Sequence, residues 1–133
     1  MIFCSSTQQL EDVLDFMSSR ARHFSAAAIF AGLDQNERDS TLDDFLEGEL
    51  RILVATEPMA KSVEVHRVDL VINFAVPTKE NYVYHVGCRS EKKGPVAINI
   101  ASEEDQERLR EIEAFYSTTI NKIPSDIIAI HEM

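Results

Sequence analysis

The sequence predicts an α/β fold in which a doubly wound parallel β-sheet is flanked by helices, within a single domain over residues 1–133. The first reason is that short apolar runs alternate with segments of helical spacing, a pattern typical of strand–helix–strand crossovers. The second is that several runs are almost continuously apolar, as in strands covered on both faces. The third is a hydrophobic content of 44% in 133 residues, which suits one core and leaves no room for two domains.

Five apolar runs are the predicted strands, and each ends at a polar or turn-forming segment. Functional side chains in parallel sheets gather beyond the carboxyl ends of the strands, so these segments are where a site is expected. In chain order the strands are residues 1–4 (MIFC), 26–32 (AAAIFAG), 51–56 (RILVAT), 69–74 (DLVINF) and 96–101 (VAINIA).

Helix start and stop signals lie between the predicted strands. Ser6 with Gln9 fits a capping box before the first helix, and Asp34 with Glu37 opens a second helix that Gly48 ends. Helical spacing supports the first helix at Leu10, Val13, Leu14 and Met17, and the second helix is expected to bury Leu42, Phe45 and Leu46.

The last third of the chain contains two further predicted helices. Residues 80–84 form a short helical stretch after Pro77, and Ser102 caps a long helix that carries Leu109, Ile112 and Tyr116 on one face. Residues 120–130 (INKIPSDIIAI) are expected to add a short strand or helix. We expect core or half-buried packing for the phenylalanines Phe16, Phe24, Phe30, Phe45, Phe74 and Phe115.

The acidic composition limits the possible partners. A net charge of −10 argues against strong autonomous binding to nucleic acid, which usually requires a basic face, and it favours a protein partner. No apolar run is long enough to span a membrane, and no signal peptide precedes the first strand. We therefore expect an intracellular protein, cytoplasmic or nuclear, and the abrupt start suggests a fragment of a longer chain.

Common catalytic and metal-binding patterns are absent from the sequence. Cys4 and Cys88 are far apart, and the four histidines are scattered, so no metal site is predicted. There is no phosphate-binding loop, no dinucleotide-binding glycine motif and no nucleophile elbow. A phosphatase-type thiolate at Cys88 would need an arginine six residues later, where Gly94 stands, so a spectator thiol is the simpler interpretation.

Three stretches, taken in order, resemble a known family. Residues 2–14 (IFCSSTQQLEDVL), 31–77 (from AGLDQNER to INFAVP) and 81–99 (NYVYHVGCRSEKKGPVAIN) resemble motifs IV to VI of the DEAD-box RNA helicases. The matching part is the second, C-terminal RecA-like domain, and residues 115–127 resemble its end in members of the translation-initiation-factor type. The resemblance covers nearly the whole chain.

The resemblance implies half of a two-lobed machine. In the family, an N-terminal lobe carries the phosphate loop and the acidic D-E-A-D motif, and neither occurs in this chain. The C-terminal domain closes over ATP and single-stranded RNA held between the lobes. ATP and Mg²⁺ are therefore implied only together with an N-terminal RecA-like lobe in cis. The domain alone is expected to hold no cofactor and to hydrolyse no ATP.

Motif VI departs most from the family pattern, which is H-R-x-G-R-x-x-R. With the glycine aligned on Gly87, the first arginine falls on His85, the arginine finger on Cys88 and the last arginine on Glu91. A finger stabilises charge on the transferring phosphoryl group and is worth about 10³ to 10⁵ in rate, which a cysteine cannot supply. Arg89, one position along, is the candidate substitute catalytic residue.

The resemblance also implies a nucleotide edge formed by Glu64, His85 and Gly87. In motif V the family aspartate that reaches the ribose is replaced by Glu64, which is one methylene longer. The family glycine is Ser62 and the family arginine is Lys61. Each change weakens contact with a nucleotide.

The RNA edge departs less from the family. Gly32 would allow close backbone approach to phosphate, Gln35 and Arg38 fit the Q-x-x-R pattern that touches the RNA backbone, and Thr56 matches the threonine that holds a phosphate. Such contacts position RNA without reading its sequence. Without the resemblance, the same residues would be polar positions at a helix start and a strand end.

The leading hypothesis is a domain with degenerate ATPase motifs that acts as an RNA- or protein-binding module in a ribonucleoprotein assembly. Single-stranded RNA would bind weakly without the second lobe. The alternative is the C-terminal half of an active ATP-dependent RNA helicase that unwinds or remodels RNA through Arg89. A purely structural role is the third possibility.

Overall fold

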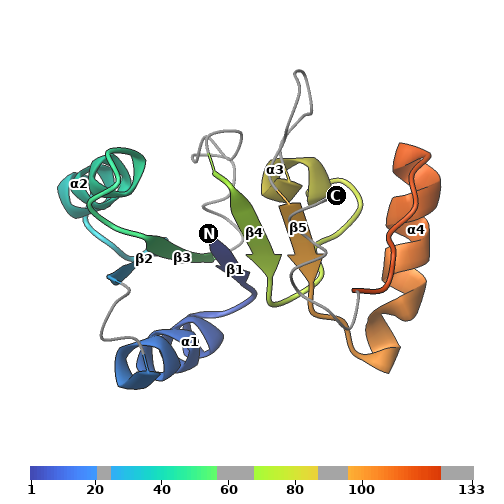
Figure 1. Ribbon diagram of the computed structural model, residues 1–133, viewed down its shortest axis with the longest axis horizontal. Helices are drawn as coiled ribbons and strands as arrows, with labels where there is room; N and C mark the ends of the chain where they lie inside the picture. Colours follow the sequence, from blue (N-terminus) through green and yellow to red (C-terminus); the bar gives the residue numbers. More distant parts are fainter. Residues whose placement is uncertain (21–24, 57–67, 87–95, 124–133) are drawn as a thin grey trace.

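The computed structural model describes residues 1–20, 25–56, 68–86 and 96–123. Its described part contains a five-stranded sheet in the order β2-β3-β1-β4-β5, in which every pair is parallel (Figure 1). The predicted doubly wound parallel sheet is therefore confirmed. The strands are β1 (Ile2–Cys4), β2 (Ala26–Ile29), β3 (Ile52–Thr56), β4 (Leu70–Asn73) and β5 (Val96–Asn99).

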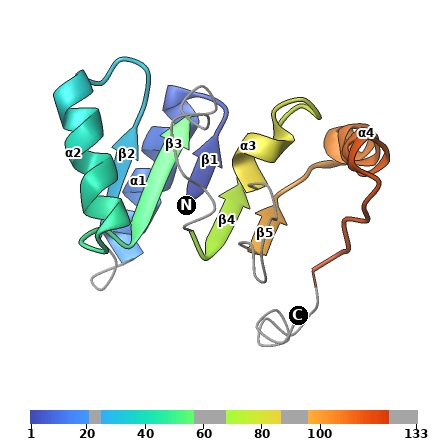
Figure 2. The ribbon, with the colours of Figure 1, turned by 90° about the horizontal axis from the view of Figure 1, so that it is seen from above.

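Helices cover both faces of the sheet. In Figure 1, α2 (Gln35–Leu46) lies above the β2–β3 side and α1 (Thr7–Arg20) lies below it. The remaining helices are the short α3 (Tyr82–Val86) and α4 (Gln106–Tyr116), which continues a 3₁₀ turn over Glu103–Asp105. Figure 2 shows α4 beyond β5, at the end of the sheet opposite α2.

The core has three parts because each group of helices buries its own set of side chains. One cluster centres on Phe3, Ile29 and Leu53, and Leu42 and Phe45 of α2 pack against it. The other face gathers Leu10, Val13 and Val54 with Leu14 and Met17 of α1. The third cluster joins Val76, Tyr82 and Ile112, with Leu109 and Tyr116 of α4 packed beside them.

The helix caps follow the sequence signals with one correction. The Ser6 hydroxyl accepts from the Gln9 backbone N–H at 3.2 Å, but Gln9 Oε1 accepts from the Ser5 backbone N–H at 2.8 Å. The reciprocal half of the predicted capping box is therefore made with Ser5. The Asp34 carboxylate accepts from the Asn36 N–H at 2.8 Å and caps α2. Gly48 ends that helix with a φ of 86°.

The short helix α3 begins two residues later than predicted. The carbonyl of Thr78 accepts from the N–H groups of both Asn81 and Tyr82, so a turn occupies the segment after Pro77 before the helix starts. The prediction for α4 is confirmed, since Ile112 is fully buried.

Several predicted core positions are more exposed than expected. Leu42, Phe45 and Leu46 of α2 are only half-buried. Phe16 and Phe115 are 56% and 57% exposed, because each lies roughly 100° around its helix from the buried stripe. The last part of the predicted tail element, residues 124–130, lies outside the described residues, and residues 120–123 form no helix or strand.

Candidate functional site

The loop after β2 carries three of the four predicted RNA-contact residues. Gly32 lies in the turn between β2 and α2, and Gln35 and Arg38 lie in the first turn of α2. The structure thus brings these three residues together beyond the carboxyl end of one strand. Because Asp34 already caps the helix, the loop and the start of α2 have a defined geometry.

Arg38 holds this loop in place. Its Nη2 donates to the carbonyl of Ala31 at 3.3 Å and to the carbonyl of Leu33 at 3.2 Å, and its Nη1 donates to Gln35 Oε1 at 3.1 Å. Gln35 Nε2 in turn donates to Asp39 at 2.8 Å. Arg38 therefore positions the loop as well as offering charge near it, a role that the sequence did not indicate.

Gly32 is not required by the fold in this conformation. Its φ is not positive, and a Cβ built there meets only the Phe30 ring, at 3.6 Å, which is ordinary van der Waals contact. The residue is exposed. An alanine at this position would fit the isolated domain, so a requirement for glycine would have to come from something approaching the loop from outside.

Thr56 ends β3 and pairs in register with Cys4 of β1. It is 6% exposed, so the strand end is almost closed over by its surroundings. Its neighbour Cys4 is also buried, and burial raises the pKa of the Cys4 thiol to about 11. Cys4 is thus a neutral thiol at neutral pH and a packing residue of the sheet.

His85 is buried at the carboxyl side of the sheet, with an exposed fraction of 1%. Its ring packs on Phe3 with the centroids 4.2 Å apart. Nδ1 lies 2.8 Å from Asn73 Oδ1, and Asn73 Nδ2 donates to Asn99 Oδ1 at 2.8 Å. Because the Asn73 oxygen faces the ring, Nδ1 carries the proton in this hydrogen bond.

A polar chain runs from His85 of α3 through the strands β4 and β5 and back to Tyr82 of the same helix. Asn99 Nδ2 donates to the Tyr82 hydroxyl at 3.3 Å, so four side chains connect β4, β5 and α3. The sequence analysis did not identify Asn73, Asn99 or Tyr82. A signal existed, since an asparagine interrupts each apolar run, and the sheet register aligns Asn73 with Asn99.

The His85 ring is neutral in this environment. Burial lowers its pKa from 6.5 to about 4, and its Nε2 is buried without a hydrogen-bond partner in the described part of the chain. A cation at this position would need a compensating charge, and Asn73 supplies only an amide oxygen. A contact between His85 and a nucleotide stays a prediction, and Glu64, Gly87, Cys88 and Arg89 lie outside the described residues.

In the described part of the chain, no group of three or more histidine, cysteine, aspartate or glutamate side chains could hold a metal ion. None of its helices is long and apolar enough to cross a bilayer.

Known proteins resemble this chain over most of its length. Residues 1–110 match the family model described as the helicase conserved C-terminal domain. The ATP-dependent RNA helicase eIF4A of Candida glabrata is 42% identical over 130 residues, which are 96% of this chain and 32% of that protein. The chain therefore spans about a third of the length of the curated relatives it matches.

Solved structures show the same fold at lower sequence identity. S. cerevisiae Dbp5 bound to RNA and ADP BeF3 superposes with a TM-score of 0.82 at 21% identity, over 98% of this chain and 36% of that one. The S. cerevisiae Dbp5 L327V C-terminal domain bound to Gle1 H337R and IP6 gives a TM-score of 0.80 at 20% identity, over 98% and 78% of the two chains.

Proposed function

The chain belongs to the helicase conserved C-terminal domain family, as the C-terminal RecA-like domain of a DEAD-box RNA helicase, and we propose that it works as an RNA- and protein-binding lobe in a ribonucleoprotein assembly. In this proposal, its ATP edge no longer supports hydrolysis. The main support for the proposal is that the His85 side chain is buried and uncharged. Where the family has the first arginine of motif VI, this chain has a buried imidazole with a pKa of about 4.

The ATP edge lacks the charges that phosphoryl transfer needs. Cys88 stands at the arginine-finger position and Glu91 at the last arginine of the motif. A neutral His85 adds no compensating cation, because its ring faces Phe3 and Asn73. Loss of an arginine finger alone lowers the rate by about 10³ to 10⁵.

ATP and Mg²⁺ are implied for the family only together with an N-terminal lobe. Of the side chains predicted to line the nucleotide, His85 is the one in the described part, and it does not fit a triphosphate because it is buried and uncharged. In this proposal, His85 therefore takes no part in a hydrolytic step. The competing function, an active helicase half, depends on Arg89.

The geometry of the predicted RNA-contact residues after β2 supports a binding role. Arg38 fastens the turn that contains Gly32, and the first N–H groups of α2 lie directly after it. Backbone N–H groups at a helix start, with a glycine that admits close approach, suit a phosphate backbone. The lone chain would bind weakly, because a net charge of −10 repels RNA.

A chimera tests the proposal. This chain replaces the matching C-terminal third of Candida glabrata eIF4A, so that an intact N-terminal lobe supplies the phosphate loop. We expect salt-sensitive RNA binding, weakened by Arg38→Ala and not by Arg110→Ala on the exposed side of α4, with ATP turnover at background. Turnover near that of unmodified eIF4A, lost on Arg89→Ala, would instead establish the active helicase half.

A further inference from the structure

The strand β2 forms an open edge of the sheet in the described structure. It pairs with β3 and is the last strand on that side. The Ser25 carbonyl accepts from the Ile52 N–H at 3.1 Å, which fixes the alternation along the strand. The N–H and C=O groups of Ala26 and Ala28 therefore point away from β3, toward the open side.

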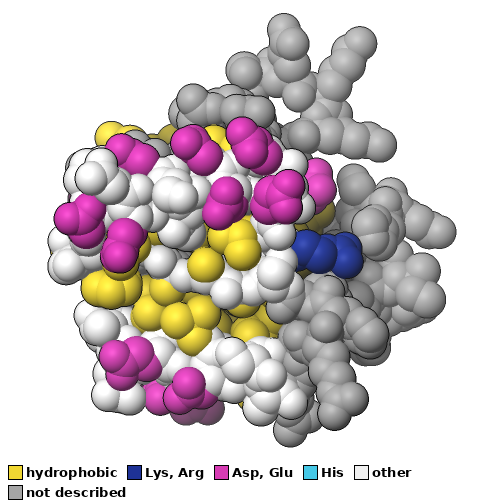
Figure 3. Space-filling view, turned by 90° about the vertical axis from the view of Figure 1, so that its left-hand side faces the viewer, with side chains coloured by type: hydrophobic (Ala, Val, Ile, Leu, Met, Phe, Trp, Pro, Cys, Tyr) yellow, Lys and Arg dark blue, Asp and Glu magenta, His cyan; other side chains and the backbone are white. Residues whose placement is uncertain are grey.

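Among the described residues, this edge lacks the usual protection against strand addition. Proteins commonly blunt exposed edges with lysine, proline or a bulge, but β2 reads Ala-Ala-Ala-Ile. Its three alanines are half-buried, so they present little side chain to obstruct an approaching backbone. Figure 3 looks onto this end of the molecule and shows an apolar stripe running between two rows of acidic side chains.

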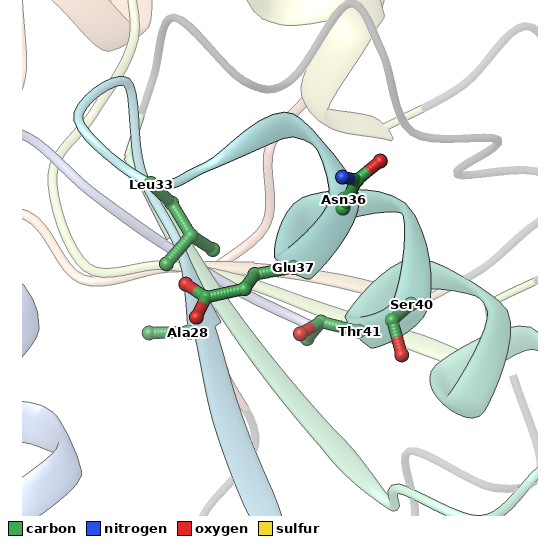
Figure 4. A pocket seen from close by; sticks show the side chains of 6 residues that line it. All are labelled: Ala28, Leu33, Asn36, Glu37, Ser40 and Thr41. Carbon is green, nitrogen blue, oxygen red and sulfur yellow. The ribbon is translucent and has the colours of Figure 1, made fainter.

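A groove lies beside the open edge, between β2 and α2 (Figure 4). Its volume is about 420 Å³, and Ala28 and Leu33 line one side of it. The α2 side contributes polar groups, with Glu37 and Thr41 nearest the strand in Figure 4. The Glu37 side chain extends from α2 toward Ala28 in Figure 4, and both residues line the groove.

The charge around the edge selects among possible occupants. Acidic residues on the two flanking helices are Glu11, Asp12 and Asp15 of α1 and Glu37, Asp39, Asp43 and Asp44 of α2. In Figure 3, acidic side chains lie on both sides of the apolar stripe, and the basic side chains drawn in this view lie at its right-hand end. Edge-to-edge pairing with a second copy would bring these like charges together, whereas a basic partner would neutralise them.

We infer that the β2 edge binds a basic, extended segment of a protein partner by strand addition. The partner backbone pairs with the outward groups of Ala26 and Ala28, and a lysine or arginine side chain enters the groove to meet Glu37. Alternate apolar side chains of the partner cover the apolar stripe. This inference rests on the proposed binding role for its context, but it involves neither ATP nor the RNA-contact residues.

The test uses the whole 133-residue chain. The probe is a short capped peptide of alternating lysine and valine, followed by backbone amide NMR and calorimetric titration. Amide shifts are expected to centre on Ala26, Ala28 and Glu37. The same peptide with every backbone amide N-methylated keeps its charge but has no N–H donor on either edge, and we expect it to bind at least about tenfold more weakly because two or more hydrogen bonds are lost.

A charge-reversal pair gives the matched protein control. Glu37→Lys is expected to weaken the lysine–valine peptide about fivefold or more, and Glu111→Lys on α4 changes the net charge equally but lies at the other end of the sheet and should change little. The inference would be overturned if the lysine–valine peptide showed no binding at millimolar concentration. It would also be overturned if the N-methylated peptide or a glutamate–valine peptide bound equally well, or if the chain self-associated through β2 in a concentration-dependent way.

The two proposals fail separately. RNA binding is measured on the chimera and peptide binding on the 133-residue chain, and Glu37→Lys should weaken peptide binding without restoring ATP turnover. Loss of RNA binding with intact peptide binding would refute the RNA-binding role alone. Intact RNA binding without peptide binding would refute the strand-addition site alone.

Discussion

Burial of a neutral His85 makes the stability of the domain depend on pH in a defined direction. The pKa of His85 is about 4 in the folded chain and 6.5 as the ordinary value for histidine. The unfolded chain therefore takes up a proton between these values when the folded chain does not. The stabilising effect is fully present above pH 6.5, decreases as the pH falls, and is lost by the time the pH reaches 4.

The size of the effect follows from the same two values. The difference in pKa lowers the free energy of unfolding by about 3 kcal/mol once His85 is fully protonated in both the folded and the unfolded chain. Between pH 7 and pH 5 the decrease is about 2 kcal/mol. His85 is 1% exposed, so solvent screening removes little of this difference. We expect the free energy of unfolding to fall by about that amount over this range because of His85 alone.

Urea unfolding at several pH values tests this prediction against His85→Gln. Glutamine is uncharged at every pH and keeps an N–H donor for Asn73 Oδ1, so the variant should retain the fold. Other titrating groups are shared by the two proteins, and the difference between their pH profiles isolates His85. Parallel profiles between pH 5 and pH 7, or a His85 ring that titrates near pH 6.5 by NMR, would show that folding does not lower the pKa of His85.

Three further predictions concern the loop, the thiol and a helix end. Gly48→Ala should lower stability by about 1 kcal/mol because φ is 86° there, while Gly32→Ala should change it by less than about 0.5 kcal/mol, as measured by urea unfolding. In a Cys88→Ser chain, iodoacetamide should label Cys4 at least about 100-fold more slowly in the folded than in the unfolded state, by mass spectrometry. Arg38→Ala should accelerate amide hydrogen exchange across residues 31–35 because the loop loses its two carbonyl contacts, whereas Arg110→Ala should not.

The sheet was predictable because each strand and helix start is marked by neighbouring residues in the sequence. Near-continuous apolar runs marked all five strands, and the caps at Ser6 and Asp34 marked the starts of α1 and α2. The exposed positions of Phe16 and Phe115 were not predicted, since they depend on which stripe of each helix faces the sheet. A hydrophobic residue alone does not reveal its angle around a helix axis.

The candidate site was less predictable because its key contacts join distant segments. The polar chain of His85, Asn73 and Asn99 exists only once β4 and β5 align in register and α3 folds over them. The position of His85 in the motif predicts a contact with a nucleotide. The motif does not predict the direction of the His85 ring, which depends on its packing against Phe3. In the same way, the bonds from Arg38 to Ala31 and Leu33 require the turn to be formed.

Restoring the arginine finger is the most direct test of the proposed loss of ATP hydrolysis. The measurement is RNA-stimulated ATP turnover of the eIF4A chimera with and without Cys88→Arg and Glu91→Arg. The buried His85 is left unchanged because a guanidinium at that position would displace its ring contact with Phe3. We expect background turnover without these changes and an increase of at least about tenfold with them. An unmodified chimera that already turns over ATP as fast as eIF4A, with no gain from the two arginines, would contradict the proposed loss of ATP hydrolysis.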